Sequence, residues 1–219
     1  THISTLCTLW RGNNNKSPLK KEEIDALSKN LFSLQRGLTG TRHLVGSSYM
    51  ENKELLGAYL LYYWPVSYMQ SQYALCSSSY PLNLWKTKHS VRILDIGSGP
   101  APVSAALCDI ILTHTKAQPS VTILDSSQKA LSLAQKLFKK DFPTVPINAI
   151  CTNIEQNGLV TQKVQSEPYD CITLSHCLNE LWQTAPLPED NKVQFITDLC
   201  TLLSPNGVLL LTEPALLST

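Results

Sequence analysis

The sequence predicts an α/β protein with a Rossmann-like, doubly wound and mostly parallel sheet, preceded by a helical extension. Short apolar runs alternate with helical patterns from about residue 91 onward, which is typical of a parallel sheet with helices on both faces. A glycine turn follows the first apolar run, and the segment before it has helical periodicity. We therefore expect an N-terminal helical region over residues 1–88 and a Rossmann-like domain over residues 89–219.

The composition fits one sizeable core and argues against several function classes. The 219 residues are 43% hydrophobic with a formal net charge of +1, so no overall positive field favours nucleic acid, although a local patch could supply such contacts. No apolar run is long enough to span a membrane, and the first residues lack a signal-peptide pattern. We expect no membrane association.

The seven cysteines include no Cys-x-x-Cys pair, which favours small buried hydrophobes in a reducing compartment over a zinc site or a disulfide framework. No metal site is expected within this chain. The cysteines expected to be buried are Cys108, Cys151, Cys171, Cys177 and Cys200.

The N-terminal region contains several helical patterns. Apolar residues recur at helical spacing between Ile24 and Leu34. A second helix over Glu51–Tyr63 is apolar nearly all round, so we expect it to be buried between other elements. Pro65 should end or kink this helix, and a further helix is expected over Val66–Leu75.

Five strands are expected in the Rossmann-like part, and ligands in such folds collect at the carboxyl ends of the strands. The predicted strands are Val91–Ile96, Val121–Leu124, Ile147–Cys151, Cys171–Leu174 and Val208–Thr212. The predicted helices between them are Val103–Thr115, Ser127–Lys140 and Asp190–Leu203.

An acid and a glycine turn follow the first strand in the stretch Asp95-Ile96-Gly97-Ser98-Gly99-Pro100. Such a turn lets a ligand approach backbone N–H groups at the positive end of a helix. Dinucleotide folds place Gly-x-Gly-x-x-Gly directly after the strand, whereas here the acid comes first and Pro102 stands where the third glycine would be. A nicotinamide-dependent dehydrogenase is therefore disfavoured, and a plain turn with a capping acid is the structural alternative.

The order hydrophobic-Asp-x-Gly-x-Gly resembles the first motif of class I S-adenosylmethionine (SAM)-dependent methyltransferases. This resemblance implies that SAM is the cofactor and that the domain over residues 89–219 binds it. The residues of the turn expected to contact the cofactor are Asp95, Gly97, Ser98 and Gly99.

The second and third strands also end in polar residues. Asp125 ends the second strand, followed by Ser126, and a carboxylate there can accept both ribose hydroxyls of a nucleotide-type cofactor. Helix capping is the alternative role for this acid. Asn153 follows the third strand, where it could bond the adenine edge while Ile154 covers the ring face; a plain turn is the alternative.

Candidate catalytic residues follow the fourth and fifth strands. Ser175 and His176 are delivered to the same edge of the sheet, Ser175 as a cofactor contact and His176 as a base or orienting group. Glu180 could bind the cofactor's ammonium or a substrate donor, and Glu213 emerges after the fifth strand. The structural alternatives are a histidine satisfied within the fold and an acid that stabilises the first turn of a helix.

Four stretches together resemble one branch of class I methyltransferases, the mitochondrial small-ribosomal-subunit assembly methyltransferase-like proteins and their bacterial relatives. The stretches are residues 58–65 (AYLLYYWP), 94–100 (LDIGSGP), 178–181 (LNEL) and 213–214 (EP). The resemblance implies methylation of ribosomal RNA or of a target associated with the small ribosomal subunit, in the cytoplasm or in the mitochondrial matrix of a eukaryote. The alternative is a catalytically silent factor that retains the fold and assists subunit assembly.

The sequence departs from the pattern of this family at Ala101 and Ala215, where glycine is usual. Ala101 lacks the freedom of glycine to adopt positive φ and crowds the cofactor turn. Many members carry cysteines for an iron–sulfur centre downstream of Glu-Pro, and this sequence stops before that region. We expect the natural protein to be longer, with further strands that complete the sheet after Thr219.

Overall fold

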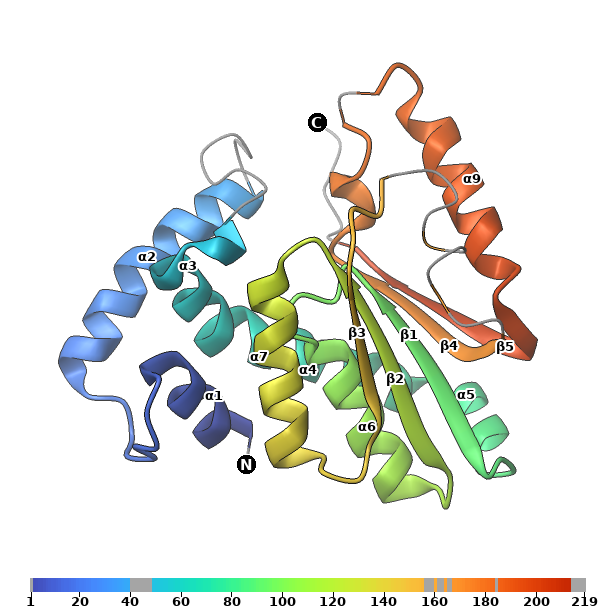
Figure 1. Cartoon of the computed structure of the whole chain (residues 1–219), viewed down its shortest axis with the longest axis horizontal. Coiled ribbons are helices and arrows are strands. Elements are labelled where there is room, and N and C mark those ends of the chain that lie inside the picture. Colours follow the sequence, from blue (N-terminus) through green and yellow to red (C-terminus); the bar gives the residue numbers. More distant parts are fainter. Residues whose placement is uncertain are drawn as a thin grey trace.

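The computed structural model of the chain describes residues 2–39, 49–155, 160, 164, 167–183 and 185–213. Its centre is a sheet of five parallel strands in the order β3-β2-β1-β4-β5 (Figure 1). The predicted doubly wound parallel sheet is confirmed, and every strand overlaps its predicted range. The strands are β1 (Ser90–Ile96), β2 (Gln118–Asp125), β3 (Ile147–Cys151), β4 (Tyr169–Ser175) and β5 (Leu203–Thr212).

The strand order reverses direction at β1. From β1 the chain moves outward to β2 and β3, then returns to the opposite side of β1 for β4 and β5. In the register of the sheet, Asp95 of β1 lies between Ile123 of β2 and Thr173 of β4. The carboxyl ends of β1 and β4 therefore bound the crevice at a topological switch point, where open α/β sheets bind their ligands.

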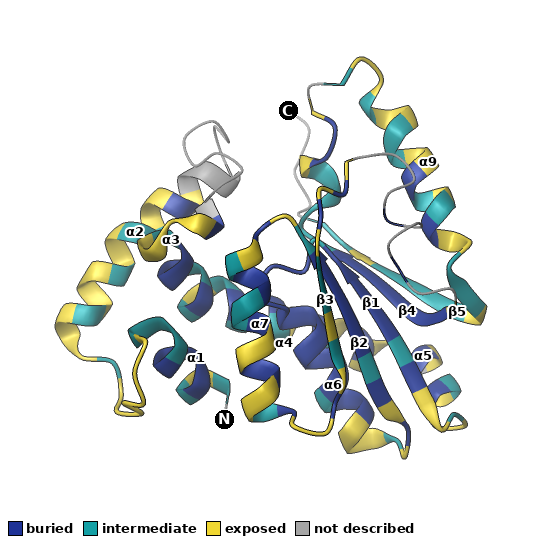
Figure 2. Cartoon of the chain, viewed as in Figure 1, coloured by how far each residue is buried: buried dark blue, intermediate teal, exposed yellow. Residues whose placement is uncertain are grey.

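Helices cover both faces of the sheet, as predicted. Helices α6 (Pro102–His114) and α7 (Gln128–Asp141) lie on one face and α9 (Pro188–Cys200) lies on the other (Figure 1). Because successive side chains of a strand point to opposite faces, Ile93 packs in the cluster of α6 and α7 while Leu94 packs in the cluster of α9. The inner strands are consequently buried along most of their length (Figure 2).

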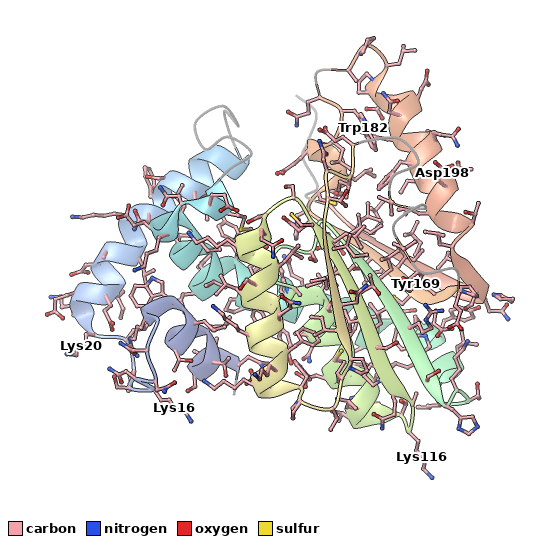
Figure 3. All side chains as sticks on the ribbon, in the orientation of Figure 1. Lys16, Lys20, Lys116, Tyr169, Trp182 and Asp198 are labelled. Atoms are coloured by element: carbon pink, nitrogen blue, oxygen red, sulfur yellow. The ribbon has the colours of Figure 1, made fainter. Side chains whose placement is uncertain are left out.

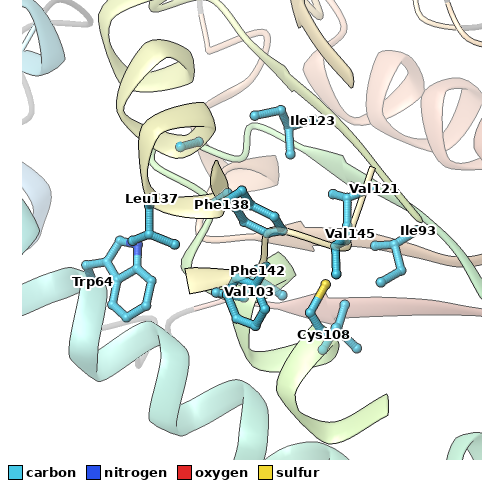
Figure 4. Packing of buried hydrophobic residues seen from close by; sticks show 14 of the residues in the cluster. Trp64, Ile93, Val103, Cys108, Val121, Ile123, Leu137, Phe138, Phe142 and Val145 are labelled. Carbon is cyan, nitrogen blue, oxygen red and sulfur yellow. The ribbon is translucent and has the colours of Figure 1, made fainter. Parts of the chain in front are cut away.

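The N-terminal region is helical, as predicted, and packs onto the sheet layer. Its elements are α1 (His2–Arg11), α2 (Lys21–Thr39), the short turn Tyr49–Glu51, α3 (Lys53–Ala58), the π-helical turn Tyr59–Tyr63, α4 (Trp64–Ser77) and α5 (Ser79–Trp85). Helix α4 packs against α6, and α1 packs against α7. The fully buried Trp64 shares one hydrophobic cluster with Val103 of α6 and with Leu137 and Phe138 of α7 (Figure 4). The hydrophobic core is thus continuous across residue 88. The domain boundary predicted at this residue stays a prediction.

The apolar segment expected as one buried helix over Glu51–Tyr63 is divided by the π-helical turn. There the N–H of Trp64 bonds to the carbonyl of Tyr59, five residues earlier. Pro65, which lacks an N–H, sits in the first turn of α4, so the interruption predicted at this proline lies just before it. Leu60 is buried, but Tyr62 is 49% exposed, so burial all round was wrong for this segment.

The cysteines are all free. Cys108 and Cys171 are buried as predicted, and Cys177 is partly buried. The expected burial was wrong for Cys151 and Cys200, which are exposed at the ends of β3 and α9, where the element stops contributing to the core. Within the described ranges, no group of three or more His, Cys, Asp and Glu side chains is placed to hold a metal ion, and no helix is long and apolar enough to cross a membrane.

A charged cluster fastens helix α1 to the sheet layer. His2 Nε2 lies 2.7 Å from Asp109 Oδ2 of α6, and His2 Nδ1 lies 2.7 Å from Asp141 Oδ2 of α7. Tyr68 of α4 donates a hydrogen bond to the same Asp109 oxygen. The hydrogen bond to Asp109 raises the pKa of His2, with further support from Asp141. The protonated imidazole therefore links the start of α1 to the middle of α6 and the end of α7.

The His2 cluster predicts a stability that depends on pH. Because the pKa of His2 is raised in the folded state, its stabilising charge is fully present below the ordinary pKa of 6.5 and is lost as the pH rises through the folded-state value. We expect His2→Gln to lower the free energy of unfolding by about 1–2 kcal/mol near about pH 6, and by less near about pH 9. Urea titration at both pH values measures this difference, and equal losses would contradict the charged cluster.

Candidate functional site

A cavity of about 570 Å³ opens at the carboxyl edge of the sheet. Its volume lies within the range of about 300–1,000 Å³ that small-molecule sites occupy. Ten of the twelve residues predicted for the site line this cavity. They are Gly97, Gly99, Asp125, Ser126, Asn153, Ile154, Ser175, His176, Glu180 and Glu213.

The glycine turn after β1 requires residues without a side chain at two positions. Gly97 has φ +64°, and a Cβ atom there would lie 2.9 Å from both Cβ and Sγ of Cys177. Gly99 has φ +52°, and its Cβ would lie 3.4 Å from Cε of Met50 in the cavity wall. Both positions have the left-handed conformation that favours glycine, and at Gly97 the close approach of Cys177 adds a steric demand, whereas the contact at Gly99 is an ordinary van der Waals distance.

Ala101 adopts a left-handed conformation at the position where the family that the sequence resembles usually has glycine. Its φ is 57° and its ψ is 48°, directly before the first turn of α6. For a residue with a Cβ this conformation costs about 1–2 kcal/mol. The sequence-based expectation of crowding at Ala101 thus corresponds to real backbone strain beside the cofactor turn, while Ala215 lies outside the described residues.

Asp95 and Ser98 lie behind the cavity wall, so their predicted contact with a cofactor stays a prediction. The two Asp95 oxygens accept hydrogen bonds of 2.6 Å from Ser104 Oγ and Thr173 Oγ1. Burial raises the pKa of Asp95 to about 6, although both hydroxyl donors act to lower it. The Ser98 side chain is buried and donates to the carbonyl of Gly99. Asp95 therefore ties β1 to α6 and β4 beneath the turn.

Asp125 connects the ends of β1 and β2 and faces the cavity. Its Oδ2 accepts a hydrogen bond of 2.8 Å from the N–H of Gly99, and its Oδ1 accepts one of 2.8 Å from the N–H of Ser127. Each carboxylate oxygen has a second lone pair, which leaves both able to accept a ribose hydroxyl. Burial raises the pKa of Asp125, against the lowering effect of these N–H groups.

Asn153 and Ile154 form the rim after β3. The Asn153 side-chain carbonyl accepts the N–H of Glu155 at 3.0 Å, so the turn that was the alternative interpretation is present. Its amide N–H₂ can still donate to a ligand. Ile154 is 8% exposed and offers an apolar face to the cavity. The two residues supply an edge of the cavity with one polar and one apolar part.

His176 occupies a strained position after β4. Its φ is 56°, and a non-glycine residue in this conformation is characteristic of functional sites. Nε2 lies 3.3 Å from Oε1 of Gln70, a residue of α4. With Nε2–H as the donor, the lone pair of Nδ1 is the acceptor. Burial lowers the pKa of His176, although Glu213 acts to raise it, so the neutral imidazole predominates near pH 7.

Glu180 belongs to the short helical turn Leu178–Glu180, and Glu213 bonds to the start of the same turn. Glu213 Oε1 accepts the N–H groups of Cys177 and Leu178 at 3.1 and 2.7 Å. Its Oε2 is buried and has no hydrogen-bond partner among the described residues. Glu213 thus caps this short helical turn with one oxygen, and its second oxygen is buried without a partner among the described residues. The helix-stabilising role that was the alternative interpretation for Glu180 stays a prediction.

The N-terminal helices contribute a wall that sequence reasoning missed. Tyr59, Tyr63 and Val66 line the cavity beside Gln70, and Met50 approaches Gly99. The signal that could have revealed this wall is the run of tyrosines at helical spacing ahead of Pro65, in a segment too apolar to face water.

The cavity residues fit SAM. A left-handed glycine turn gives close access to the backbone, Asp125 offers lone pairs for hydroxyl groups, and Asn153 with Ile154 suits a purine edge. The acidic lining also suits a ligand that carries a positive sulfonium and an ammonium group.

A parallel sheet with a glycine turn after β1, an acid at the end of β2 and a cavity at the switch point defines a Rossmann-like protein that binds a nucleotide-type cofactor. Residues 87–219 match the family model described as a methyltransferase domain. The chain therefore belongs to the methyltransferase domain family, and SAM is the cofactor, as the sequence predicted.

Several solved structures are similar to this chain. One is an S-adenosylmethionine-dependent methyltransferase from Clostridium acetobutylicum ATCC 824, at 18% identity and TM-score 0.47, covering 66% of this chain and 49% of that chain. The plantazolicin methyltransferase BpumL in complex with SAH has 22% identity and TM-score 0.44, with 84% and 58% covered. MNMC2 from Aquifex aeolicus has 13% identity and TM-score 0.47, with 66% and 50% covered.

The chain thus spans about half the length of these solved proteins. No curated protein matches the sequence significantly.

The glycine turn gives a prediction with a matched control. Gly97→Ala combines positive φ with contact to Cys177, whereas Gly12→Ala at φ +69° meets nothing within 4 Å. We expect Gly12→Ala to lower the free energy of unfolding by about 1 kcal/mol and Gly97→Ala by about 2–4 kcal/mol, because overpacking adds to strain. Urea denaturation of both variants measures the gap. Equal losses of unfolding free energy would show that the turn can shift to accommodate the added methyl group, so that the contact with Cys177 costs nothing.

Proposed function

We propose that this chain is a SAM-dependent methyltransferase that acts on ribosomal RNA or on a target associated with the small ribosomal subunit. The observation that carries the activity is the position of Ser175, His176 and Glu213 in the same cavity as the glycine turn and Asp125. The cavity thus contains a part that suits the cofactor and, beside it, polar side chains that a methyl acceptor can contact. Support for the target comes from the four sequence stretches that resemble the ribosome-assembly branch, whose members act in the cytoplasm or the mitochondrial matrix.

When bound, SAM supplies a methyl group on a positively charged sulfur. The residues of this chain then have to align the acceptor and keep water out, and good alignment alone is worth about 7–11 kcal/mol in ideal intramolecular cases. Asp125 and the glycine turn hold the cofactor in place. The wall formed by Tyr59 and Tyr63 limits the space in which the acceptor can bind. The neutral His176 can orient the acceptor or take a proton at Nδ1.

One observation favours the second candidate, a catalytically silent factor that assists small-subunit assembly. Ala101 replaces the family's glycine at a left-handed position next to the cofactor turn, so a cofactor would bind beside a strained backbone. Binding and transfer therefore have to be measured separately.

Asp125 is the residue whose loss should most weaken cofactor binding. Asp125→Ala removes the acceptor of the Gly99 and Ser127 N–H groups and the expected acceptor of the ribose hydroxyls. We expect the Kd for SAM, measured by calorimetry, to rise about tenfold or more. The control is Asp25→Ala on the exposed surface of α2, which should leave the Kd unchanged. A wild-type Kd retained by the Asp125 variant would refute the assigned cofactor pocket.

Methyl transfer distinguishes the two candidates. Purified small-subunit precursors are incubated with the protein and methyl-labelled SAM, with Asp125→Ala as the inactive control. Label that appears only with the intact pocket supports the enzyme. The assembly factor is supported if the wild-type protein binds SAM but transfers no label to the precursors, and if both the wild type and Asp125→Ala co-sediment with the small subunit.

A further inference from the structure

The part of the cavity lining that follows the strands of the sheet is acidic. Asp125, Glu155, Glu180 and Glu213 line it, and none of the described lining residues is Lys or Arg. His176 does not offset these charges near pH 7, because burial lowers its pKa. Bound SAM brings one net positive charge, which leaves the carboxylates in excess. A site of this sign concentrates cationic ligands and repels anionic ones.

Glu213 has an oxygen that needs a donor. Oε1 is occupied by two backbone N–H groups, whereas Oε2 is buried without a partner among the described residues. A carboxylate oxygen accepts hydrogen bonds and cannot donate them, and an unpaired buried polar atom costs about 1–3 kcal/mol. A ligand with N–H groups that enters this part of the cavity would satisfy this atom, and Cys177, which donates its N–H to Oε1 of the same carboxylate, directly follows His176.

An aromatic wall faces these carboxylates. Tyr63 stacks on Tyr59 with ring centroids 5.9 Å apart, and Tyr62 meets Tyr63 edge-on at 5.1 Å. Tyr63 and Val66 line the cavity, and Val66 is 38% exposed, so the wall continues to the surface. Aromatic faces attract ammonium groups, and the stem of a lysine packs along apolar surface while its charged end reaches a polar site.

We propose that the acceptor is a primary amino group of a protein, on a lysine side chain or a chain N-terminus, which passes Tyr63 and Val66 and donates an N–H to Glu213. This inference rests on the proposed methyltransferase function and narrows its target to protein rather than RNA. RNA carries a phosphate at every nucleotide and is held by Lys and Arg. Lys16, Lys20 and Lys116 point into solvent away from the carboxyl ends of the strands (Figure 3).

The transfer balances with this acceptor. The ammonium first releases a proton to Glu213 Oε2 and becomes a neutral amine. Its lone pair forms the new N–C bond as the bond between sulfur and the methyl carbon breaks, and that electron pair stays on sulfur. The products are a methylated ammonium, which now carries the positive charge, and S-adenosylhomocysteine (SAH), which lacks the sulfonium charge. Glu213 then returns its proton to water.

Binding in the presence of SAH tests the inference without depending on turnover. The probes are a short peptide with one lysine and an acetylated N-terminus, a lysine-free peptide with a free N-terminus, the fully acetylated form of each, and a short single-stranded RNA. Calorimetry with the protein–SAH complex should show binding of at least one free amine, weakened about tenfold or more by acetylation. The two free peptides distinguish a lysine from an N-terminus. Binding of RNA but of neither peptide would overturn the proposal.

Glu213→Gln removes the negative charge and keeps the shape of the side chain. We expect it to weaken binding of the free-amine peptide about tenfold, with the affinity for SAH and the thermal melting temperature nearly unchanged. The matched control is Glu189→Gln, an exposed carboxylate on α9 that pairs with Lys192, which should change neither affinity. Equal peptide binding by wild type and Glu213→Gln would sink the assignment.

Three outcomes keep the two proposals separate. If wild-type protein binds neither SAM nor SAH, the proposed function itself fails. If SAH binds but neither free amine does, only the amine acceptor fails. If Glu213→Gln loses its fold, the acetylated probes with wild-type protein still decide the question.

Discussion

The carboxylate of Asp125 holds together parts of the site that come from different stretches of the chain. It accepts the N–H of Gly99 from the turn after β1 and the N–H of Ser127 from the start of α7, and it faces the cavity between them. Ser127 in turn caps α7 through Ala130 and donates its hydroxyl to Glu51 of the N-terminal region. Burying a carboxylate is costly unless its oxygens are paired, and these N–H groups supply the pairing. The geometry of the glycine turn therefore depends on an acid at the end of another strand.

The wall opposite the sheet is fixed to that same turn. Trp64 donates its indole N–H to the carbonyl of Pro100 at 3.0 Å, and α4 packs along α6. Trp64 also closes the π-helical turn Tyr59–Tyr63. Its hydrogen bond to Pro100 therefore links the turn that carries the two cavity tyrosines to the end of the glycine turn. The N-terminal helices are thus part of the site, and the hydrophobic core shows no break between them and the sheet.

The sequence predicted the sheet and the residues at its carboxyl edge because strand ends of a parallel sheet converge without any knowledge of long-range packing. Asp125, His176 and Glu213 are separated widely in sequence, yet each follows a strand and each lines the cavity. Asp95 differs from these residues, because it lies inside β1 and its side chain accepts hydrogen bonds from Ser104 and Thr173. It does not line the cavity, so its contact with the cofactor stays a prediction. The tyrosine wall is harder to predict. The run of tyrosines indicates a helix face that packs against something, but the docking of α4 on α6 and the π-helical turn leave no local pattern that identifies the element it faces.

The acidic cavity also bears on how product leaves. Four carboxylates without a described Lys or Arg beside them attract a sulfonium ligand by Coulomb forces, which at an effective dielectric of about 20 amount to about 4 kcal/mol for a pair of charges 4 Å apart. Methyl transfer moves the positive charge from sulfur to the acceptor, so the attraction for the spent cofactor falls while that for a methylated ammonium persists. Release of the modified amine then needs a route back to water, and the partly exposed Val66 marks where the wall meets the surface. The carboxylates that favour a cationic substrate therefore also favour retention of the methylated product.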